Sequence, residues 1–269
     1  MASRIEIIKT SGDRLANASL KEEGGKGLFT KEIEEALLAG AIDVAVHSLK
    51  DLPTEMTPGL VIAATPERED PRDAIAGCRL SELKAGATVG TSSGRRAAQL
   101  RMLRRDLDVQ PVRGNVDTRL RKLKEGQFAA MVLATAGLRR LGMEGEIAEI
   151  FSPEQMCPAP GQGALAIQMR EEDVAREICG QLDHGPTRRA VTCERAALAA
   201  LGGGCQLPVG AFAEEVEGVL RLIVIVASLD GSVQLRGSGE DARDAEALGR
   251  AVGEDLVSRG AGRLLAESR

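Results

Sequence analysis

The 269-residue sequence predicts an α/β protein of three domains. Apolar runs of strand length alternate with helical patterns through the first two thirds of the chain, which indicates α/β architecture with largely parallel sheets. From Pro186 onward the pattern changes to an Ala-rich helix followed by strand-like segments, which indicates a small α+β domain.

The first α/β unit is expected at the start of the chain. A helical pattern covers residues 30–38 and is ended by Gly40, and a polar, hinge-like stretch over 66–73 follows the unit. The predicted strands are residues 5–8, 41–46 and 60–64.

The second unit repeats this alternation. Its predicted elements are a strand at 87–89, a helix at 95–104, a strand at 109–112, a helix at 116–124 and a strand at 128–133. A Pro-rich connection over 157–163 then leads to an apolar segment at 164–167, which we expect to return to the first unit. Domain 1 would therefore comprise residues 1–66 and 163–183, and domain 2 residues 67–162.

Domain 3 is predicted over residues 184–269. Its expected elements are a helix at 189–201, strands at 209–213, 219–228 and 233–237, and helices at 241–258 and 262–267. Asp230-Gly231 is a hairpin-turn signal between the last two strands, so we expect antiparallel pairing there.

Composition argues against several classes of function. Aromatic residues make up 1% of the chain, so base stacking is a poor explanation for its chemistry. The first residues do not resemble a signal peptide, and no run reaches the roughly 18 apolar residues of a membrane span, so we expect a cytoplasmic protein. Five scattered cysteines and two histidines argue against a disulfide framework and a metal site.

Arginines are concentrated in one part of this acidic chain. Residues 91–140 hold ten Arg and two Lys against three Asp and one Glu. Arginine preferred over lysine suits bidentate recognition of carboxylate or phosphate, whereas a solvated basic face is the alternative.

The segment 43–53 carries the first candidate site. A buried strand would deliver Ser48, Lys50 and Asp51 to its carboxyl end, where ligands bind in open α/β sheets. Asp51 could stabilise a developing cation or transfer protons, although a Lys-Asp pair before proline also suits an ordinary turn. His47 alone fits a structural histidine better than a base.

Three predicted strand ends carry arginines. The junction over 90–96 combines hydroxyls, a glycine and Arg95-Arg96 at a helix start, where free N–H groups favour anions, although an ordinary capping serine is the alternative. Arg113 and Arg119 surround the next junction, and Arg139 and Arg140 follow the third strand. This repetition predicts a ligand that carries several carboxylates or phosphates.

Two glycine-rich segments remain. Residues 24–29, with Lys26 and Phe29, lack the spacing of a nucleotide-binding loop and suit a loop that covers a cleft. Cys205 follows three glycines, which permit a sharp bend and an exposed thiol, although a lone cysteine is more often buried and inert.

Together, in this order, the motifs resemble porphobilinogen deaminases (hydroxymethylbilane synthases) along nearly the whole chain. The matching segments are residues 24–29, 47–53, 67–73, 91–96, 113–119, 159–163 and 203–206. This resemblance implies two domains like those of periplasmic binding proteins around a cleft, with a third that carries a cysteine loop.

The resemblance also implies the reaction. The family joins four porphobilinogen molecules into hydroxymethylbilane with release of ammonia, on a dipyrromethane cofactor that Cys205 would hold covalently. Asp51 would be the catalytic carboxylate. In the glycine-rich segment Lys26 and Phe29 are expected to contact substrate, although a core role suits Phe29 equally well. The remaining implied cofactor-binding residues are Lys50, Ser92, Ser93, Arg95, Arg96, Arg113, Arg119, Arg140 and Gln162.

The chain also departs from the family pattern. It opens at what resembles the second strand, so the family's N-terminal strand and loop are expected to be missing, and Gly94, Ala129 and Glu22 are atypical. We expect a monomer that binds no nucleic acid. The alternative function is a non-catalytic module that binds a carboxylate or phosphate compound and has lost activity through the shortened N-terminus.

Overall fold

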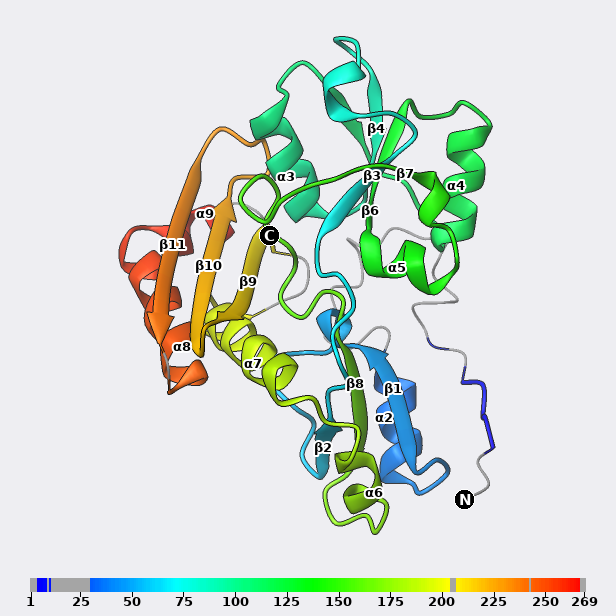
Figure 1. The fold of residues 1–269 in the computed structure, drawn as a ribbon, viewed down its shortest axis with the longest axis vertical. Helices are drawn as coiled ribbons and strands as arrows, with labels where there is room; N and C mark the ends of the chain where they lie inside the picture. The colour runs from blue at the N-terminus through cyan, green and yellow to red at the C-terminus, as the bar shows by residue number, and fades with distance from the viewer. Residues whose placement is uncertain (1–3, 9, 11–29, 204–206, 242, 267–269) are drawn as a thin grey trace.

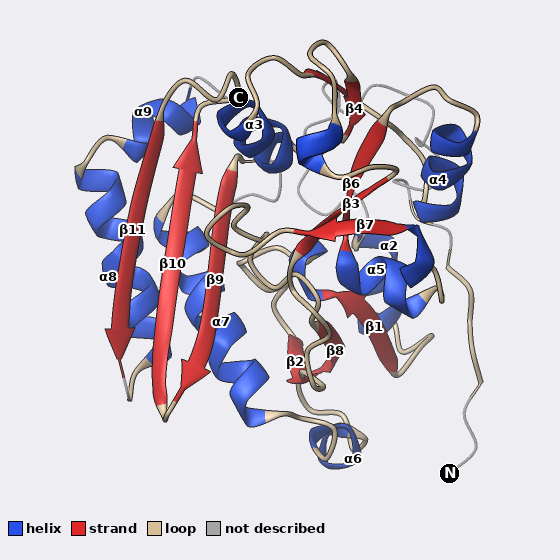
Figure 2. Cartoon of the chain, turned by 45° about the horizontal axis from the view of Figure 1, so that its top comes forward, coloured by secondary structure: helices blue, strands red, loops and turns tan. Residues whose placement is uncertain are grey.

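The computed structural model describes residues 4–8, 10, 30–203, 207–241 and 243–266. Within these residues the strands form three sheets, each with its own helices (Figures 1 and 2). The α/β class with a smaller C-terminal α+β part is confirmed.

The first sheet has the order β1-β8-β2 and lies at the bottom of Figure 1. Its strands are β1 (Val44–Ser48), β2 (Leu60–Ala64) and β8 (Leu165–Arg170), accompanied by α2 (Lys31–Leu38), the short 3-10 turn η2 (Leu49–Asp51) and α6 (Arg176–Gly180). The segment after the Pro-rich connection does return here, as predicted. The expectation of parallel strands is wrong for this sheet, because β8 runs antiparallel to both neighbours.

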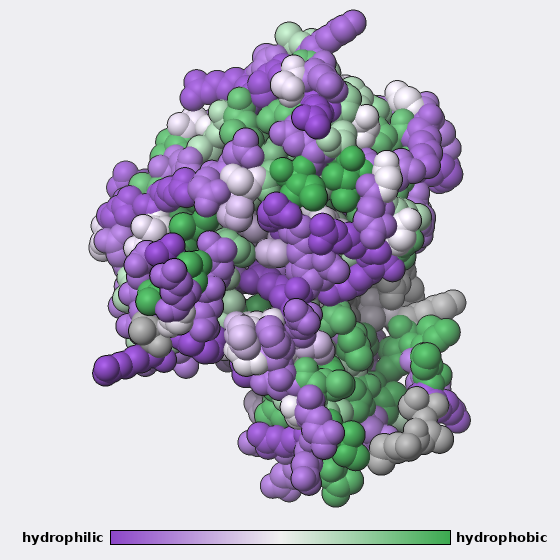
Figure 3. Space-filling view, in the orientation of Figure 1, coloured by the Kyte–Doolittle hydropathy of each residue, from purple (hydrophilic) through white to green (hydrophobic). Residues whose placement is uncertain are grey.

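The predicted strand at residues 5–8 is also wrong. Residues 4–8 form no strand, and Ile5 and Ile7 are 89% and 84% exposed. Alternating apolar residues suit a half-buried strand only where a neighbouring strand supplies backbone partners. In the space-filling view, apolar residues gather over the lower part of the face shown, where β1 and β8 lie (Figure 3), and Val46 of β1 is 65% exposed.

The second sheet has the order β5-β4-β6-β3-β7 and mixed directions. Its elements are β3 (Asp73–Ala76), η3 (Leu80–Glu82), β4 (Thr88–Gly90), α3 (Gly94–Leu103), β5 (Asp108–Gln110), α4 (Val116–Lys124), β6 (Ala130–Ala134), α5 (Thr135–Arg140), η4 (Glu144–Glu146) and β7 (Ile147–Ile150). β4 is parallel to β5 and β6, whereas β3 is antiparallel to β6 and β7. The pattern did not predict β3, β7 or α5.

The third sheet is antiparallel, with the order β11-β10-β9. Its elements are α7 (Gly185–Ala200), β9 (Val209–Val216), β10 (Val219–Ala227), β11 (Gln234–Asp241), α8 (Ala245–Ser258) and α9 (Ala261–Ala266). α7 and α8 pack closely because Gly253 faces α7, where an added Cβ would lie 2.6 Å from that of Ala200. The predicted turn at Asp230-Gly231 connects β10 and β11, and Gly231 has a φ of 71°.

A buried ion pair joins the three parts. Arg68, in the stretch between the first two sheets, donates to the fully buried Glu194 of α7 at 2.7 and 3.0 Å. Glu194 also accepts from the backbone N–H of Gly161, in the returning connection, and of Ala213 in β9, at 2.7 and 2.8 Å. One carboxylate therefore fixes both connecting segments to the C-terminal part.

Candidate active site

Lys50 and Asp51 lie on the turn η2, directly after β1. The turn is held by buried leucines on either side, because Leu49 is fully buried and Leu52 is 2% exposed. The N–H of Leu49 donates to the carbonyl of Ala164 at 3.0 Å, which ties the turn to the residue directly before β8. Asp51 is exposed to solvent and lies at the carboxyl end of β1, the position that the sequence predicted.

The surroundings act on both charges of this turn. Asp51 is exposed, yet desolvation by the surrounding protein atoms raises its pKa, and the positive charges of Lys50 and Arg96 oppose that rise. Burial and the positive charge of Arg96 lower the pKa of Lys50 to about 8, against a partial rise from Asp51. Both residues therefore share one desolvated, positively charged environment.

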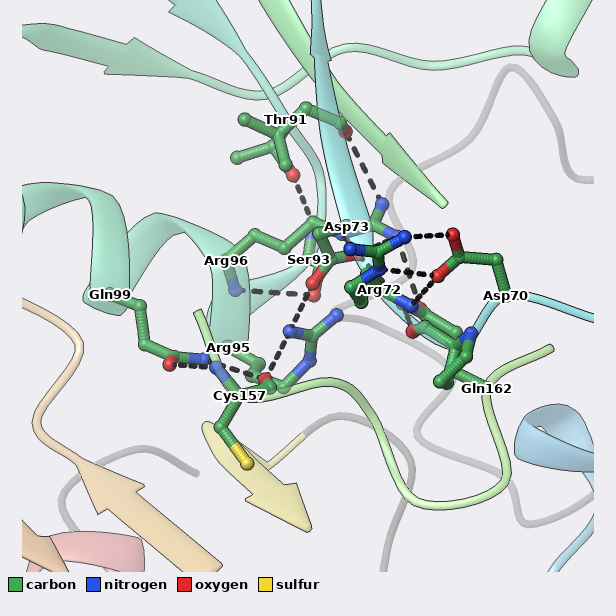
Figure 4. A network of polar contacts seen from close by, with 12 residues as sticks. Asp70, Arg72, Asp73, Thr91, Ser93, Arg95, Arg96, Gln99, Cys157 and Gln162 are labelled. Atoms are coloured by element: carbon green, nitrogen blue, oxygen red, sulfur yellow. Dashed lines mark hydrogen bonds and ion pairs between the residues drawn. The ribbon is translucent and has the colours of Figure 1, made fainter. Parts of the chain in front are cut away.

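Arg95 and Arg96 lie at the start of α3, where the side chain of Ser93 caps the helix by accepting from the N–H of Arg96. Both side chains point inward and are 4% and 6% exposed. Figure 4 shows them converging on Asp73, the first residue of β3. Arg95 donates to Asp73 Oδ2 at 2.6 Å, and Arg96 to Oδ1 at 2.7 Å.

Gln162 completes this cluster. Its Nε2 donates to Asp73 Oδ1 and to the carbonyl of Pro71, at 2.8 and 2.7 Å, and its Oε1 accepts from Arg96 at 3.2 Å. Burial would raise the pKa of Asp73, but the two arginines hold it well below its usual range. A fully buried, ionised carboxylate thus pairs with both arginines that the sequence assigned to ligand carboxylates, and its single charge balances one of their two positive charges.

Arg95 retains a buried donor without a partner in the described chain. Its Nη1 bonds Asp73 and the carbonyl of Cys157, both at 2.6 Å, whereas its buried Nε has no hydrogen-bond partner within the described chain. A buried guanidinium N–H without an acceptor is uncommon, so this atom could receive one from a ligand.

The other predicted arginines lie nearer the surface. Arg119 is half-buried, and burial and the charge of Arg96 lower its pKa. Arg113 and Arg140 are exposed, and Arg140 donates to the carbonyl of Gly163 at 2.6 Å. The hydroxyl of Ser92 bonds both the N–H and the carbonyl of Val112, so it joins two strand ends.

Arg195 of α7 is a residue that the sequence reading missed. It donates to the carbonyls of Leu52, Pro53 and Thr54, at 3.2, 2.6 and 3.4 Å. Asp73 was missed as well, although a charged residue opening the short apolar run 74–76 was a signal for it.

Cys205, Lys26 and Phe29 lie outside the described residues. The nearest described position before Cys205 is Gly203, where an added Cβ would lie 2.9 Å from the Thr54 hydroxyl. The end of α7 therefore lies against the segment that follows Asp51.

The described residues hold no group of three or more His, Cys, Asp or Glu side chains placed to bind a metal ion. No helix in this part of the chain has the length and apolar character needed to span a bilayer.

Comparison with known proteins gives matches along almost the whole chain. Residues 1–177 match the family model described as porphobilinogen deaminase, dipyromethane cofactor binding domain, and residues 188–258 match porphobilinogen deaminase, C-terminal domain. The chain is 51% identical to a porphobilinogen deaminase of Acidothermus cellulolyticus, over 97% of this chain and 82% of that protein.

Other matches are similar in extent. A porphobilinogen deaminase of Syntrophus aciditrophicus is 49% identical, over 99% of this chain and 89% of its own. Among solved structures, the periplasmic aliphatic sulphonate binding protein SsuA of Escherichia coli covers 62% of this chain and 56% of its own, at 18% identity and a TM-score of 0.34.

Proposed function

The chain belongs to the porphobilinogen deaminase family, and we propose that Asp51 is the carboxylate with which it performs the family reaction. The enzymes of this family are transferases that condense four porphobilinogen molecules into hydroxymethylbilane, with release of ammonia, in tetrapyrrole biosynthesis. The cofactor is dipyrromethane.

The observation that carries the proposal is the setting of Asp51. It is an exposed carboxylate whose pKa is raised, on a turn held by buried leucines. In each condensation the aminomethyl C–N bond of porphobilinogen breaks, ammonia leaves, a C–C bond forms, and the attacking pyrrole carbon loses a proton. Asp51 stabilises the positive charge that develops as ammonia leaves, and its raised proton affinity suits it to move that proton.

The arginines supply the means of recognition. Pyrrole acetate and propionate groups are carboxylates, which guanidinium groups bind in bidentate fashion. We assign the cofactor carboxylates to Arg95, Arg96, Arg113, Arg119 and Arg140, with Lys50, Ser92, Ser93 and Gln162 adding hydrogen bonds. Two observations support this fit. Nε of Arg95 has no partner in the described chain, and the charge of Arg96 acts on Arg119 strongly enough to lower its pKa.

Cys205 is the proposed attachment point of the cofactor, which supplies the pyrrole carbon that joins the first substrate. The close approach of Gly203 to Thr54, which leaves no room for a Cβ at residue 203, supports this assignment, because it brings the segment before Cys205 near the turn that carries Asp51. Lys26 and Phe29 are proposed to contact substrate.

The remaining proposals concern the molecule as a whole. We propose domains of residues 1–66 with 163–183, 67–162, and 184–269, which the three separate sheets support.

We also propose a cytoplasmic monomer that acts on porphobilinogen. The free state of the four described cysteines suits a reducing compartment. Sedimentation should give one species with the 28.4 kDa mass of the chain.

The test compares Asp51→Asn with the unaltered chain in a porphobilinogen-consumption assay, after expression in a host that supplies porphobilinogen. Loss of the carboxylate charge should lower kcat about 100-fold or more. Intact-protein mass spectrometry should show a dipyrromethane adduct that Cys205→Ser abolishes.

Asp255→Asn, on the exposed face of α8, serves as the control and should keep full activity. Unchanged kcat in Asp51→Asn would contradict the role of Asp51. The family comparison does not favour the non-catalytic alternative, which predicts ligand binding without turnover in the unaltered chain.

A further inference from the structure

A row of buried polar side chains crosses the first sheet beside the catalytic turn. Glu34 of α2, 9% exposed, accepts from the Thr57 hydroxyl and from Gln168 Nε2, both at 2.8 Å. Gln168 of β8 is fully buried, and His47 of β1 is 7% exposed. The proposed reaction uses none of these four side chains.

The row reaches His47 across two paired strands. In the β1–β8 ladder Ala45 lies opposite Gln168, and His47 lies opposite Ala166. His47 and Gln168 are therefore diagonal neighbours on one face of the sheet, within reach of long side chains. Two buried atoms in this row have no hydrogen-bond partner in the described chain, Nε2 of His47 and Oε1 of Gln168.

The chemistry of the groups fixes the direction of the hydrogen bonds. Glu34 accepts from the amide nitrogen of Gln168, so the amide oxygen of Gln168 is turned away from this carboxyl group. That oxygen can only accept as well, and Nε2 of the diagonal His47 is a buried ring nitrogen without a partner in the described chain. Neither atom has a hydrogen-bond partner as the side chains are placed, and a proton on Nε2 directed at this oxygen would satisfy both, whereas a proton on Nδ1 would leave both as acceptors without a donor.

We propose that Glu34 and Gln168 are positioning residues of the reaction, which hold His47 as a neutral imidazole with its proton on Nε2, beside the turn that carries Asp51. This inference rests on the proposed role of Asp51.

The charge state of His47 matters because of what faces it. Burial lowers its pKa, against opposing contributions from the Gln168 side chain and from the charges of Glu34 on α2 and Asp51 on η2. The ring is therefore neutral at neutral pH. A protonated His47 would add a cation to Lys50 and Arg96 around Asp51, and would compete with the positive charge that develops in the substrate.

Nitrogen NMR tests the proton position directly, because the chain has two histidines and His184→Asn leaves His47 as the only one. Asparagine is a favoured residue at the helix N-terminus that His184 occupies. Long-range ¹H–¹⁵N correlation spectra of the labelled full chain at neutral pH should show Nε2 protonated and Nδ1 unprotonated. A proton on Nδ1, or on both nitrogens, would overturn the proposal.

Variants in the same background test the link to the reaction. Gln168→Leu removes the acceptor and should give mixed tautomers with kcat lowered about tenfold, as for loss of an outer partner of an oriented imidazole. Gln168→Glu adds a carboxylate, should raise the pKa of His47 and should protonate it at neutral pH, with kcat again lowered. The spectra also report whether each variant is folded.

Gln127→Glu, on an exposed turn, is the matched control and should change neither the His47 signals nor kcat. Altered tautomers with an unchanged kcat and pH profile would disprove the positioning role. Failure of the proposed function is a separate result, because unchanged kcat in Asp51→Asn would leave the tautomer measurement intact.

Discussion

Lys50 and Asp51 are neighbours in the sequence, and desolvation shifts their pKa values in opposite directions. Desolvation favours the neutral form of each group, so it raises the pKa of Asp51 and lowers that of Lys50 to about 8. The turn therefore holds one group that binds a proton more readily and one that loses a proton more readily than usual.

The lowered pKa of Lys50 predicts an alkaline limb in the activity. As pH rises through about 8 the ammonium loses its charge, so Asp51 loses the cation that most strongly opposes the rise of its pKa, and kcat should fall. Lys50→Met should have a lower kcat at pH 7 and should lack this limb. A pH profile of porphobilinogen consumption measures both, and an identical limb in Lys50→Met would refute the assignment.

The same shift makes a stability prediction for Lys50. Its folded pKa lies below the usual 10.5, so between about 8 and 10.5 the unfolded chain binds more protons, and the free energy of unfolding rises with pH. Below pH 8 the cost of burying the charged ammonium is fully present. Urea unfolding across this range should show the rise in the unaltered chain and its loss in Lys50→Met.

Asp73 predicts a larger effect on stability. Asp73→Asn leaves the buried cations of Arg95 and Arg96 without their counter-ion, which should lower the free energy of unfolding by about 3 to 5 kcal/mol at pH 7. Because the folded pKa of Asp73 is depressed, its contribution is present above the unfolded value of about 3.9 and is lost as pH falls towards the folded value.

Urea unfolding at pH 7 checks the Asp73→Asn prediction, with Asp255→Asn as an exposed control expected within about 0.5 kcal/mol of the unaltered chain. Equal losses in the two variants would show that Asp73 is not the counter-ion of the arginines.

Sequence patterns identified these arginines but not their partner. Arg95 and Arg96 were predicted from their place at a helix start, and the structure puts them there. Asp73 is 22 residues earlier than Arg95, and Gln162 is 66 residues later than Arg96, so only the folded sheet brings them together. Local patterns predict the position of a residue on its helix or strand. The charged partners of its side chain depend on the tertiary fold.

At the scale of elements, the turn that carries Asp51 depends on α7. Arg195 reaches the carbonyls of Leu52, Pro53 and Thr54 and so fixes the chain directly after Asp51. Arg195→Leu should let this segment shift and lower kcat about tenfold or more, with KM changed less, because misplacement of a catalytic group mainly affects the transition state.

Arg195→Lys should recover part of the kcat, since an ammonium can bond one or two of the three carbonyls. Arg250→Leu removes an exposed arginine of α8 and is expected to leave kcat and KM unchanged. If Arg195→Leu raised only KM, the contact would bind substrate instead of positioning the turn.

Elements were predictable where apolar periodicity was strong. The helix at 116–124 and the strand at 60–64 have the predicted bounds. The strand β3 was hidden because it has four residues and begins with a charged one, Asp73, whose burial depends on Arg95. Residues 5–8 show the converse, because a strand pattern without a paired neighbour forms no strand.

At the scale of the whole molecule, the chain crosses between the first two sheets twice. The predicted return of residues 164–167 is confirmed, because β8 lies between β1 and β2. Its antiparallel direction was not predicted, since a periodicity of two residues identifies a strand without giving its direction. The two crossing segments meet at the pair of Arg68 and Glu194.

Glu194 is the one described carboxylate that bonds both crossing segments and β9, so its removal should loosen the C-terminal part from the other two. Glu194→Gln removes the charge that pairs with Arg68 and should lower the free energy of unfolding by about 3 to 5 kcal/mol. The amide also replaces one acceptor by a donor, which faces the N–H of Gly161 or Ala213 unfavourably.

Hydrogen exchange of single amides distinguishes loosening from general destabilisation. If Glu194 couples the parts, Glu194→Gln should speed exchange in β9 and around Gly161 more than in β4 and β6, because local opening becomes cheaper than global unfolding. Arg68→Leu should give the same pattern, and the double variant should cost less than the sum of the two single variants, as expected for contacting residues. Uniform acceleration across all three sheets, or additive losses, would mean that the pair stabilises the fold without coupling its parts.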